Sequence, residues 1–593
     1  MEEAKRGYTI SDIYQGGYSS LSPPENAGYI TAGSIGIATD PRTANILQEV
    51  SSKLSSGVKY LEVEGASPEI FDSIPKQHLK EVYRLSKLTG IDVSMHAPVM
   101  DVSGIDPRGG GNFSESERQL SERKIAEALL RAHELNPEGN IPVNFHTANM
   151  GGSQLLPPSQ RKEGEKYKQL IIINRENGRL APLEPEREYH PGMAGEELEK
   201  GRYRTPEKRV KNLSETEWGN SINQLFFNQE RAKEILDKTK PFLQHLENLK
   251  ENETPSPAQA EIIRNFHTAQ NYLQDINQHA NALFSRAYKY GKDEQKNELK
   301  KLSEQFKKEL EDSGKGINGI YGHAQAMQNL LTELKNPLYI PEMWVPLEDF
   351  ATEKSAESFG NAAWQAYKKL KGKNIPILTI ENPPAGYALS TGEDVRKVVE
   401  ASREKFIENA VAGGLSQGKA REEAEKLIGA TWDVGHINML RKYGYSEKEI
   451  IKEAEQVAPL IKHVHLSDNF GFEHTELPMG MGNVPLKEIM EKLGQKGYDA
   501  KKIIEAGHWW QHFKTQPFQE TLEAVGSPIY GMKMAPYWSW APDLSQGYFG
   551  GYGQMLPQIN YETFGAGFSR LPAELGGQNP SAQGSRMSGR QME

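Results

Sequence analysis

Imidazole and carboxylate side chains occur at or just after the ends of several short apolar runs in this chain of 593 residues. They are His96, His146, Glu381, Asp433, His436, His465 and Glu505. If these groups gathered in one place without cations, they would repel one another and lose hydration at a high cost. The chain has no cysteine, so only nitrogen and oxygen donors remain, and these suit zinc, manganese or iron. The set therefore predicts a centre for divalent metal ions.

The apolar runs that carry these donors alternate with helical segments. Runs at 33–39, 59–65, 92–98 and 141–149 form one series, and runs at 374–382, 428–436, 461–468 and 501–507 form a second. Strands that alternate with helices form parallel βαβ units, and eight such units favour a closed (β/α)8 TIM barrel over an open sheet. Active sites of these barrels lie at the C-terminal ends of the strands, which is where all seven donors fall.

The alternation stops between the two series. The segment QLIIINRENGRLAPLEPE (169–186) is typical of a β-hairpin, because apolar residues flank the turn signal Asn177-Gly178. Polar helical patterns follow from about 205 to 335. We therefore predict a lead segment at 1–32, barrel halves at 33–150 (strands 1–4) and 353–526 (strands 5–8), a mostly helical insertion at 151–352, and an irregular C-terminal extension at 527–593 that is first aromatic and then disordered. The insertion leaves from the catalytic rim, so it is predicted to act as a lid or as a docking platform for a protein partner.

Charge and hydropathy narrow the class of protein. The net charge of -10 counts against strong non-specific binding to duplex nucleic acid. No stretch approaches the roughly 20 apolar residues that span a bilayer, and the N-terminus lacks the apolar region of a signal peptide. These features predict a cytoplasmic protein without a membrane partner.

Five phrases, VNFHTAN, TIENPPAG, TWDVGH, HVHLSDN and IIEAG, occur in this order along the chain. Together they resemble the endonuclease IV family of abasic-site endonucleases, within the xylose-isomerase-like TIM barrels, over roughly 33–150 and 355–525. The resemblance implies up to three zinc ions. The first would be held by His96, His146 and Glu381, and Glu381 would bridge to a second, held also by Asp433, His465 and Glu505.

The third ion implied by the resemblance would bind His436 and a pair of residues just before a Gly-x-Gly turn. The family has Asp-x-His there, whereas this chain has His474 and Glu476 before Gly480-Met481-Gly482. The donor types survive in swapped order. The third site is thus the one at which this sequence departs from the family pattern.

Two activities are compatible with these residues. An endonuclease IV-like enzyme would be a metal-dependent hydrolase of phosphate esters, acting in DNA repair at abasic sites, with a metal-bound hydroxide that attacks phosphorus. The sugar epimerases and isomerases of the same barrel class use a single ion, for which manganese is an alternative to zinc. The equivalents of Glu381, Asp433, His465 and Glu505 hold it, and the two glutamates move a proton on a ketose; all four residues are present.

Paired ions can clamp the attacking and leaving oxygens of a displacement at phosphorus, so the two early histidines favour the hydrolase over the isomerase. Glu381 and Glu505 are the predicted catalytic residues in either case. A third hypothesis is a non-catalytic barrel scaffold whose insertion binds a partner.

Several neighbouring polar residues are given other roles. His463 is interpreted as a histidine of the barrel interior that bonds to a neighbour, since it lies one pleat before His465. Asp468 is predicted to orient a ligand imidazole or to cap the next turn. Glu62 and Glu64 on the second strand are candidate rim carboxylates, but they are not among the predicted ligands.

Overall fold

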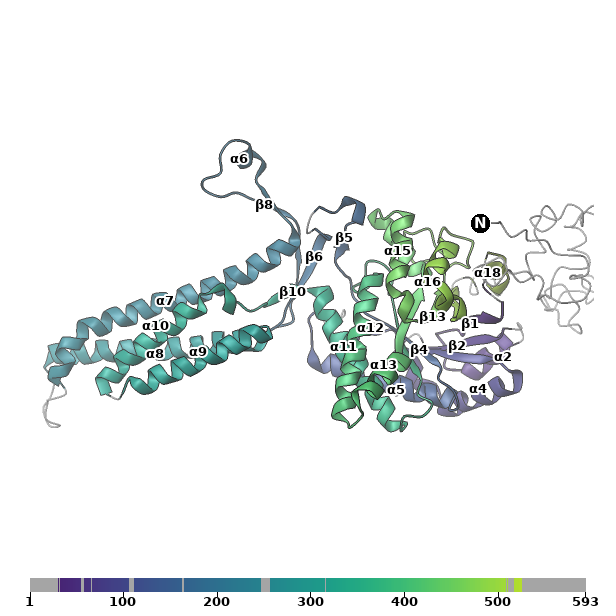
Figure 1. The fold of residues 1–593 in the computed structure, drawn as a ribbon, viewed down its shortest axis with the longest axis horizontal. Helices are drawn as coiled ribbons and strands as arrows, with labels where there is room; N and C mark the ends of the chain where they lie inside the picture. Colours follow the sequence, from purple (N-terminus) through teal and green to yellow (C-terminus); the bar gives the residue numbers. More distant parts are fainter. Residues whose placement is uncertain are drawn as a thin grey trace, which may run out of the picture. The chain divides into compact units, whose positions relative to one another are not determined.

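The computed structural model describes residue 30 and residues 32–54, 58–65, 67–105, 111–162, 165–246, 256–314, 316–507, 509 and 517–524. The predicted C-terminal extension at 527–593 lies outside these residues, as does nearly all of the lead segment at 1–32. The chain divides into two compact units, one of Met1–Lys162 with Glu348–Glu593 and the other of Glu163–Leu347 (Figure 1). The first unit contains both predicted series of strands.

The first unit is built on a closed barrel of eight parallel strands, in the order β1-β14-β13-β12-β11-β4-β3-β2. The strands are β1 (Ile35–Ala38), β2 (Tyr60–Glu64), β3 (Asp92–His96), β4 (Pro142–His146), β11 (Ile377–Glu381), β12 (Ile428–Asp433), β13 (Ile461–Leu466) and β14 (Lys501–Ile504). Each of the eight predicted runs contains one of them. The prediction of a (β/α)8 barrel is therefore confirmed.

Helices surround the barrel in Figure 1 and bury the outward faces of the strands. They are α2 (Ile46–Leu54), α3 (Pro68–Ser73), α4 (Lys76–Thr89), α5 (Glu115–Leu135), α11 (Leu347–Lys369), α12 (Gly392–Ala412), α13 (Gln417–Leu427), α14 (Val434–Asn438), α15 (Glu447–Val457), α16 (Leu486–Asp499) and α18 (Phe518–Ala524). The run predicted as a strand to residue 436 ends earlier, at Asp433. The carboxylate of Asp433 accepts a hydrogen bond of 2.6 Å from the amide of His436 and so caps the N-terminus of α14.

A buried carboxylate fastens the start of α11 to the segment that follows β4. Glu348 accepts hydrogen bonds from the Ser153 amide (2.8 Å) and hydroxyl (3.0 Å). Burial raises the pKa of Glu348 to about 7. The folded protein therefore binds this proton more tightly than the unfolded chain does, and the stabilisation it contributes is present below about pH 4.5 and is lost as the pH rises towards 7.

We expect Glu348→Gln to stabilise the barrel above pH 7 by up to about 3 kcal/mol, because the amide keeps both contacts with Ser153 without a charge to bury. Below pH 5 the variant and the parent protein should be equally stable. Urea unfolding at both pH values measures the difference. An equal effect at both values would contradict the assigned pKa.

The second unit consists of a small sheet and four long helices. The central strand β6 (Tyr167–Asn174) pairs antiparallel with β7 (Leu180–Leu183) and with β10 (Trp344–Pro346). The predicted hairpin is present, with Gly178 at a φ of 70°. However, the turn spans four residues between Asn174 and Arg179 rather than two: the Asn174 amide donates to the Arg179 carbonyl (2.9 Å), and the Asn174 carbonyl accepts the Gly178 amide (2.8 Å). A second ribbon pairs β8 (Glu186–Glu188) with β9 (Arg202–Arg204), beside the short α6 (Glu196–Lys200).

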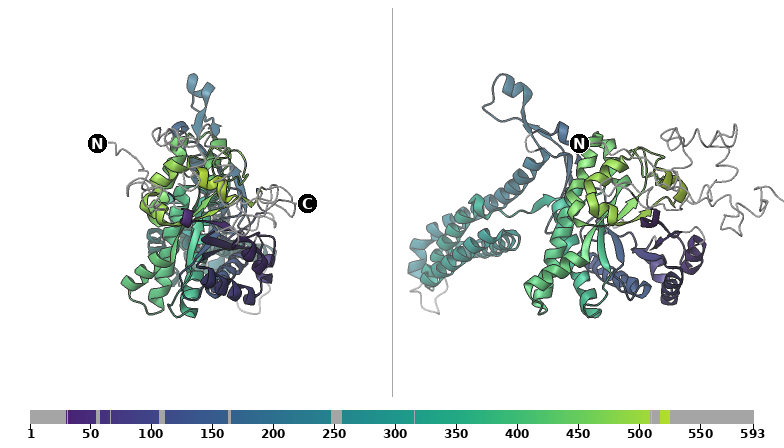
Figure 2. Two further views of the ribbon diagram at one scale, coloured as in Figure 1. Left: turned by 90° about the vertical axis from the view of Figure 1, so that its right-hand side faces the viewer. Right: turned by 45° about the vertical axis from the view of Figure 1, so that its right-hand side comes forward.

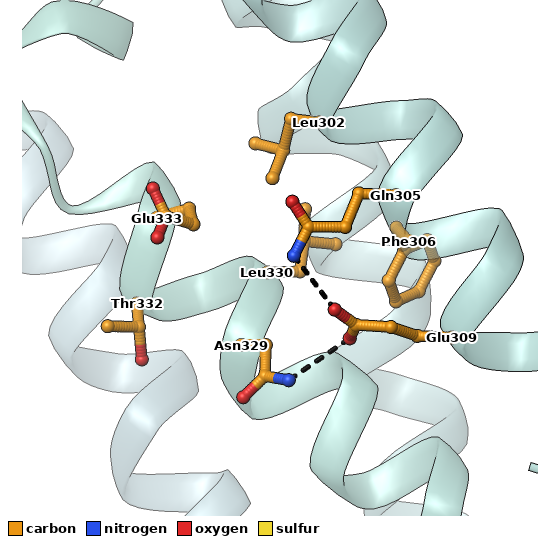
Figure 3. A pocket seen from close by; sticks show the side chains of 8 residues that line it. All are labelled: Leu302, Gln305, Phe306, Glu309, Asn329, Leu330, Thr332 and Glu333. Carbon is orange, nitrogen blue, oxygen red and sulfur yellow. Dashed lines mark hydrogen bonds between the residues drawn. The ribbon is translucent and has the colours of Figure 1, made fainter.

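The four long helices are α7 (Pro206–Leu246), α8 (Pro257–Tyr290), α9 (Asp293–Asp312) and α10 (Gly316–Leu334). They lie side by side as an elongated bundle (Figure 2), with a buried stripe that includes Ile222, Ile276, Leu299 and Leu331. Between α9 and α10 is a hollow of about 170 Å³ (Figure 3). Its carboxylate, Glu309, is bonded to Gln305 and Asn329. Among the described residues no helix is long and apolar enough to cross a membrane.

Candidate metal centre

The register of the barrel brings the predicted donors to one level at the C-terminal ends of the strands. Glu381 on β11 lies opposite His146 on β4, and Asp433 on β12 lies opposite His465 on β13. His96 ends β3. Glu505 follows β14 directly, and its amide bonds to the carbonyl of Leu466. The closed parallel barrel thus gathers side chains that are hundreds of residues apart in the sequence.

Glu381 is fully buried at the middle of this group, and four imidazoles surround its two oxygens. Nε2 of His96 and Nε2 of His146 lie 3.5 and 3.4 Å from Oε2. Nδ1 of His465 and Nδ1 of His436 lie 3.0 and 3.6 Å from Oε1. Each oxygen therefore faces different imidazoles, and Oε2 also accepts a hydrogen bond from the side-chain amide of Asn144.

Asp433, Glu505 and His465 occupy the side of the rim nearest Oε1. Glu505 Oε1 lies 2.9 Å from Nδ1 of His465. Asp433 accepts a hydrogen bond of 3.1 Å from the Ser467 hydroxyl, which holds its carboxylate in place. Ligand atoms of Glu381, Asp433, His436 and Glu505 all lie within 4.8 Å of one another, as do those of His96, His146 and Glu381. The structure brings these donors together, while their roles as ligands stay predictions.

Backbone carbonyls determine the tautomers of two of the histidines. Nδ1 of His96 lies 2.7 Å from the Ala97 carbonyl, and Nδ1 of His436 lies 2.8 Å from the Asn382 carbonyl. A carbonyl can only accept, so each Nδ1 must carry a hydrogen and each Nε2 is available as a donor atom. Nε2 of His96 then faces the Glu381 carboxylate, and a proton or a cation must lie between them.

The pKa values at the rim show how charge is distributed when only protons are present. Burial tends to lower the pKa of His96, but Glu381, Glu64 and Glu505 outweigh it and raise the pKa to about 10. Burial lowers the pKa of His146 to about 3, although His146 faces the same carboxylate oxygen. At neutral pH His96 is therefore protonated and His146 is neutral, so the pair carries one positive charge.

The carboxylates of the rim fit a divalent metal. Burial raises the pKa values of Asp433 and Glu505, and the neighbouring Glu381 adds to both shifts. Among the described residues no lysine or arginine forms an ion pair with Glu381, Asp433 or Glu505. Buried carboxylates without a lysine or arginine partner are stable only with protons, protonated imidazoles or metal ions nearby. Oxygen and imidazole donors together suit zinc or manganese.

The residues predicted for a third site lie on the loop after β13. Nε2 of His474 lies 2.8 Å from Nε2 of His436, and it lies 3.6 Å from Oε1 of Glu476. Burial and the neighbouring His436 together lower the pKa of His474 to about 4. The pair of histidines is thus neutral and can share one hydrogen or face one cation. His474 lies against His436, and Glu476 lies beside His474, while their roles as ligands stay predictions.

Asp468 anchors this loop rather than orienting an imidazole, which corrects the first of the two roles predicted for it. Its Oδ2 accepts the amides of Gly480 (2.8 Å) and Gly482 (2.9 Å), and its Oδ1 accepts the amide of Val484 (3.0 Å). Gly480 has a φ of 88°, and a Cβ at Gly482 would lie 2.4 Å from Oδ1 of Asp468. The Gly-x-Gly turn therefore exists so that backbone amides can approach this carboxylate.

Replacing Asp468 by asparagine is expected to loosen the loop, because an NH₂ group would then face amide donors. Loss of two charge-assisted hydrogen bonds should cost about 3 kcal/mol locally. Hydrogen exchange should show faster exchange at Gly480 and Gly482, with β12 and β13 unchanged. Glu473→Gln removes a charge from an exposed position of the same loop and should leave exchange unaltered. Equal protection in both variants would refute the anchoring role.

Glu62 and Glu64, the two candidate carboxylates of β2, lie at different levels: Glu64 pairs with His96 at the rim, and Glu62 pairs with Ser94 one pleat below it. Glu62 is fully buried between His463 and His465, at 3.1 Å from Nε2 of each. Glu64 shares a set of ligand atoms within 4.8 Å with Glu62 and Glu505. Strand alternation accounts for the shared face, since Tyr60, Glu62 and Glu64 must all point inward from β2. His463 is bonded to a neighbour in the barrel interior, as interpreted from the sequence.

Comparison with known proteins agrees with this architecture. A sequence profile of the xylose isomerase-like TIM barrel family matches residues 393–525. An uncharacterized protein of Methanocaldococcus jannaschii is 26% identical over 195 residues, which are 33% of this chain and 57% of that protein. The match thus spans little more than half the length of the curated relative.

Solved structures similar to this chain include a D-tagatose 3-epimerase-like protein, with 13% identity and a TM-score of 0.33 over 83% of this chain and 99% of that one. They also include D-psicose 3-epimerase from Clostridium cellulolyticum H10, with 8% identity and a TM-score of 0.35 over 83% of this chain and 96% of that one. The chain has a xylose isomerase-like TIM barrel fold. The narrower assignment to the endonuclease IV family is not confirmed.

Proposed function

We propose that this chain is an enzyme, a metal-dependent hydrolase of phosphate esters that uses two or three divalent ions, with zinc the expected metal. The observation that carries the proposal is that the two carboxylate oxygens of Glu381 face different histidines. Its Oε2 faces His96 and His146, while its Oε1 faces His465. A single-ion enzyme has no need of the two histidines on Oε2, whereas paired ions need donors on both sides of a shared carboxylate.

The ligand residues form three groups, each of which would hold one metal ion. His96 and His146 with Oε2 of Glu381 would hold one ion, and Asp433, His465 and Glu505 with Oε1 would hold another. His436 with His474 is the basis for a third. When bound, such ions supply Lewis acidity that activates water and neutralises charge on phosphoryl oxygens. Carbonyls of Ala97 and Asn382 keep the donor nitrogens aimed at the centre.

Metal analysis together with turnover tests the proposal. Protein prepared without chelators should contain two or more ions per chain and should hydrolyse members of a panel of phosphate esters, namely DNA with an abasic site, nucleotides and sugar phosphates. His96→Ala should lose about one ion per chain and nearly all turnover. His279→Ala, at an exposed position of α8, is the control and should lose neither. One ion per chain, unchanged in His96→Ala, would refute the hydrolase.

A single-ion ketose isomerase or epimerase is the second candidate, and one contact favours it. Oε1 of Glu381 and Oε1 of Glu505 lie 3.0 and 2.9 Å from the same nitrogen of His465, so the two glutamates flank one position. Such a pair could move a proton on and off a sugar carbon. Incubation with a panel of ketoses in deuterated water would then give deuterium at carbon. The hydrolase predicts none.

A further inference from the structure

A tier of polar side chains lies inside the barrel, one pleat below the rim. Six strands contribute to it, each with the residue two positions before a rim residue. They are Glu62, Ser94, Asn144, Thr379, Thr431 and His463, and all are fully buried. Barrel interiors of this kind are usually filled by Val, Ile and Leu. Because burying polar groups is costly unless they are used, this inner tier needs a physical reason.

Glu62 is the hub of the inner tier. Its Oε2 accepts a hydrogen bond of 2.5 Å from the Ser94 hydroxyl and lies 3.1 Å from Nε2 of His463. Its Oε1 lies 3.1 Å from Nε2 of His465, which belongs to the rim above. Among the described residues no lysine or arginine forms an ion pair with Glu62. The carboxylate is therefore held from below and presents one oxygen upwards.

The two nitrogens of His465 have different surroundings. Nδ1 faces Glu381 and Glu505, which are themselves proposed to bind the ions. Nε2 faces Glu62, which lies outside those groups. In the structure Nδ1 is well aligned on Oε1 of Glu381, whereas the contact between Nε2 and Glu62 is close but bent. A ring that gives Nδ1 to an ion keeps its hydrogen on Nε2, and Glu62 is the acceptor within reach.

We propose that Glu62 is a positioning residue, which holds His465 in the Nε2–H tautomer so that the lone pair of Nδ1 is directed at the metal centre. A carboxylate on the far nitrogen also makes the imidazole a stronger donor. Ser94 and His463 keep Glu62 in place. The inference rests on the metal centre of the proposed function, and it holds for either reaction considered above.

A cation bound by Glu62, His463 and His465 is the other explanation for this cluster. The contacts of Oε2 favour hydrogen bonds. Nε2 of His463 forms one with Oε2 at 3.1 Å, whereas Nε2 of His465 lies 3.1 Å from Oε1 without the alignment of a hydrogen bond. A hydroxyl donor already occupies Oε2 as well.

Zinc affinity, measured by competition with a chromophoric chelator, tests the positioning role on the full chain. Glu62→Leu should bind zinc 10-fold to 100-fold more weakly at one site, the usual range for losing such a partner. Glu62→Gln retains an acceptor oxygen and should recover part of that loss. Thr431→Val is the matched control, since it is isosteric, lies in the same inner tier and removes a hydroxyl without a hydrogen-bond partner. It should bind zinc like the parent protein.

NMR of protein labelled with ¹⁵N-histidine reports the protonation of each ring nitrogen directly. It therefore distinguishes the positioning role of Glu62 from a general loss of structure. In the zinc-loaded parent, His465 should show a protonated Nε2 with a slowly exchanging hydrogen and a metal-bound Nδ1, and the slow exchange should vanish in Glu62→Leu. Unchanged affinity and an unchanged His465 spectrum in Glu62→Leu would overturn the inference, as would the loss of a whole zinc ion with His465 unaffected. A parent protein that binds no zinc would instead overturn the proposed function.

Discussion

Replacing Glu381 by glutamine is expected to reduce turnover by about 10³-fold or more and to remove at least one metal ion per chain. The carboxylate is fully buried and is the one group that both clusters of histidines share. An amide of the same size keeps the packing but removes the negative charge that would join two cations. Loss of several kcal/mol of transition-state stabilisation corresponds to this factor, at about 1.4 kcal/mol for each tenfold change.

Glu348→Gln is the matched control for Glu381→Gln. It makes the same chemical change at another buried glutamate of the barrel, whose partner is Ser153 rather than a histidine. Metal content and turnover should be those of the parent protein. Steady-state kinetics and metal analysis on the two variants side by side make the comparison. If Glu381→Gln retained both metal and turnover, Glu381 could not be a shared ligand.

Removal of the metal ions is expected to destabilise the barrel, and to do so more strongly at pH 9 than at pH 6.5. An ion present at about 1,000 times its dissociation constant stabilises the folded state by about 4 kcal/mol. In the metal-free protein the pKa of His96 is raised to about 10, mainly because Glu381 outweighs the effect of burial. That stabilisation is complete below about pH 6.5, the ordinary value for histidine, and is lost as the pH rises towards 10.

The pKa shifts of other rim residues also change how the stability of the metal-free protein depends on pH. The raised pKa values of Asp433 and Glu505 also make the metal-free protein less stable as the pH rises above about 4. The lowered pKa of His146 acts in the opposite direction, but only below about pH 6.5. Between pH 6.5 and 9 the raised pKa of His96 alone should therefore cost the metal-free protein about 3 kcal/mol of stability, and the raised pKa of His465 acts in the same direction. The loaded protein should lose much less, because cations replace the protons.

Calorimetry of chelator-treated and zinc-loaded protein at the two pH values measures this difference. The Glu348→Gln background should be used for both, since it removes a buried glutamate remote from the rim whose pKa is raised to about 7. Parallel loss of stability in the two forms would show that no cation replaces the proton on His96.

The sequence was sufficient to predict which side chains point into the barrel, because this depends only on the local alternation of side chains along each strand. Alternation of side chains in a strand determines that His96, Glu381 and His465 face inward if their runs are strands. Eight runs separated by helices leave few topologies other than a closed barrel. The gathering of donors at one rim then follows from the parallel direction of the strands. The turn after Asn174 was less accessible, since its backbone carbonyl accepts the Gly178 amide while its side-chain oxygen accepts the amides of Glu176 and Asn177.

The pairing of individual atoms was decided by the tertiary structure alone. Glu62 and His463 are 401 positions apart and meet because β2 and β13 both border the same closed interior. No local pattern shows which oxygen of Glu381 faces which imidazole, since that depends on side-chain rotamers packed from several strands at once. The sequence by itself thus determined the barrel and the chemical types of its rim donors. Only closure of the barrel decided the two-sided surroundings of Glu381 and the carboxylate beneath His465, because both arise from contacts between residues far apart in the chain.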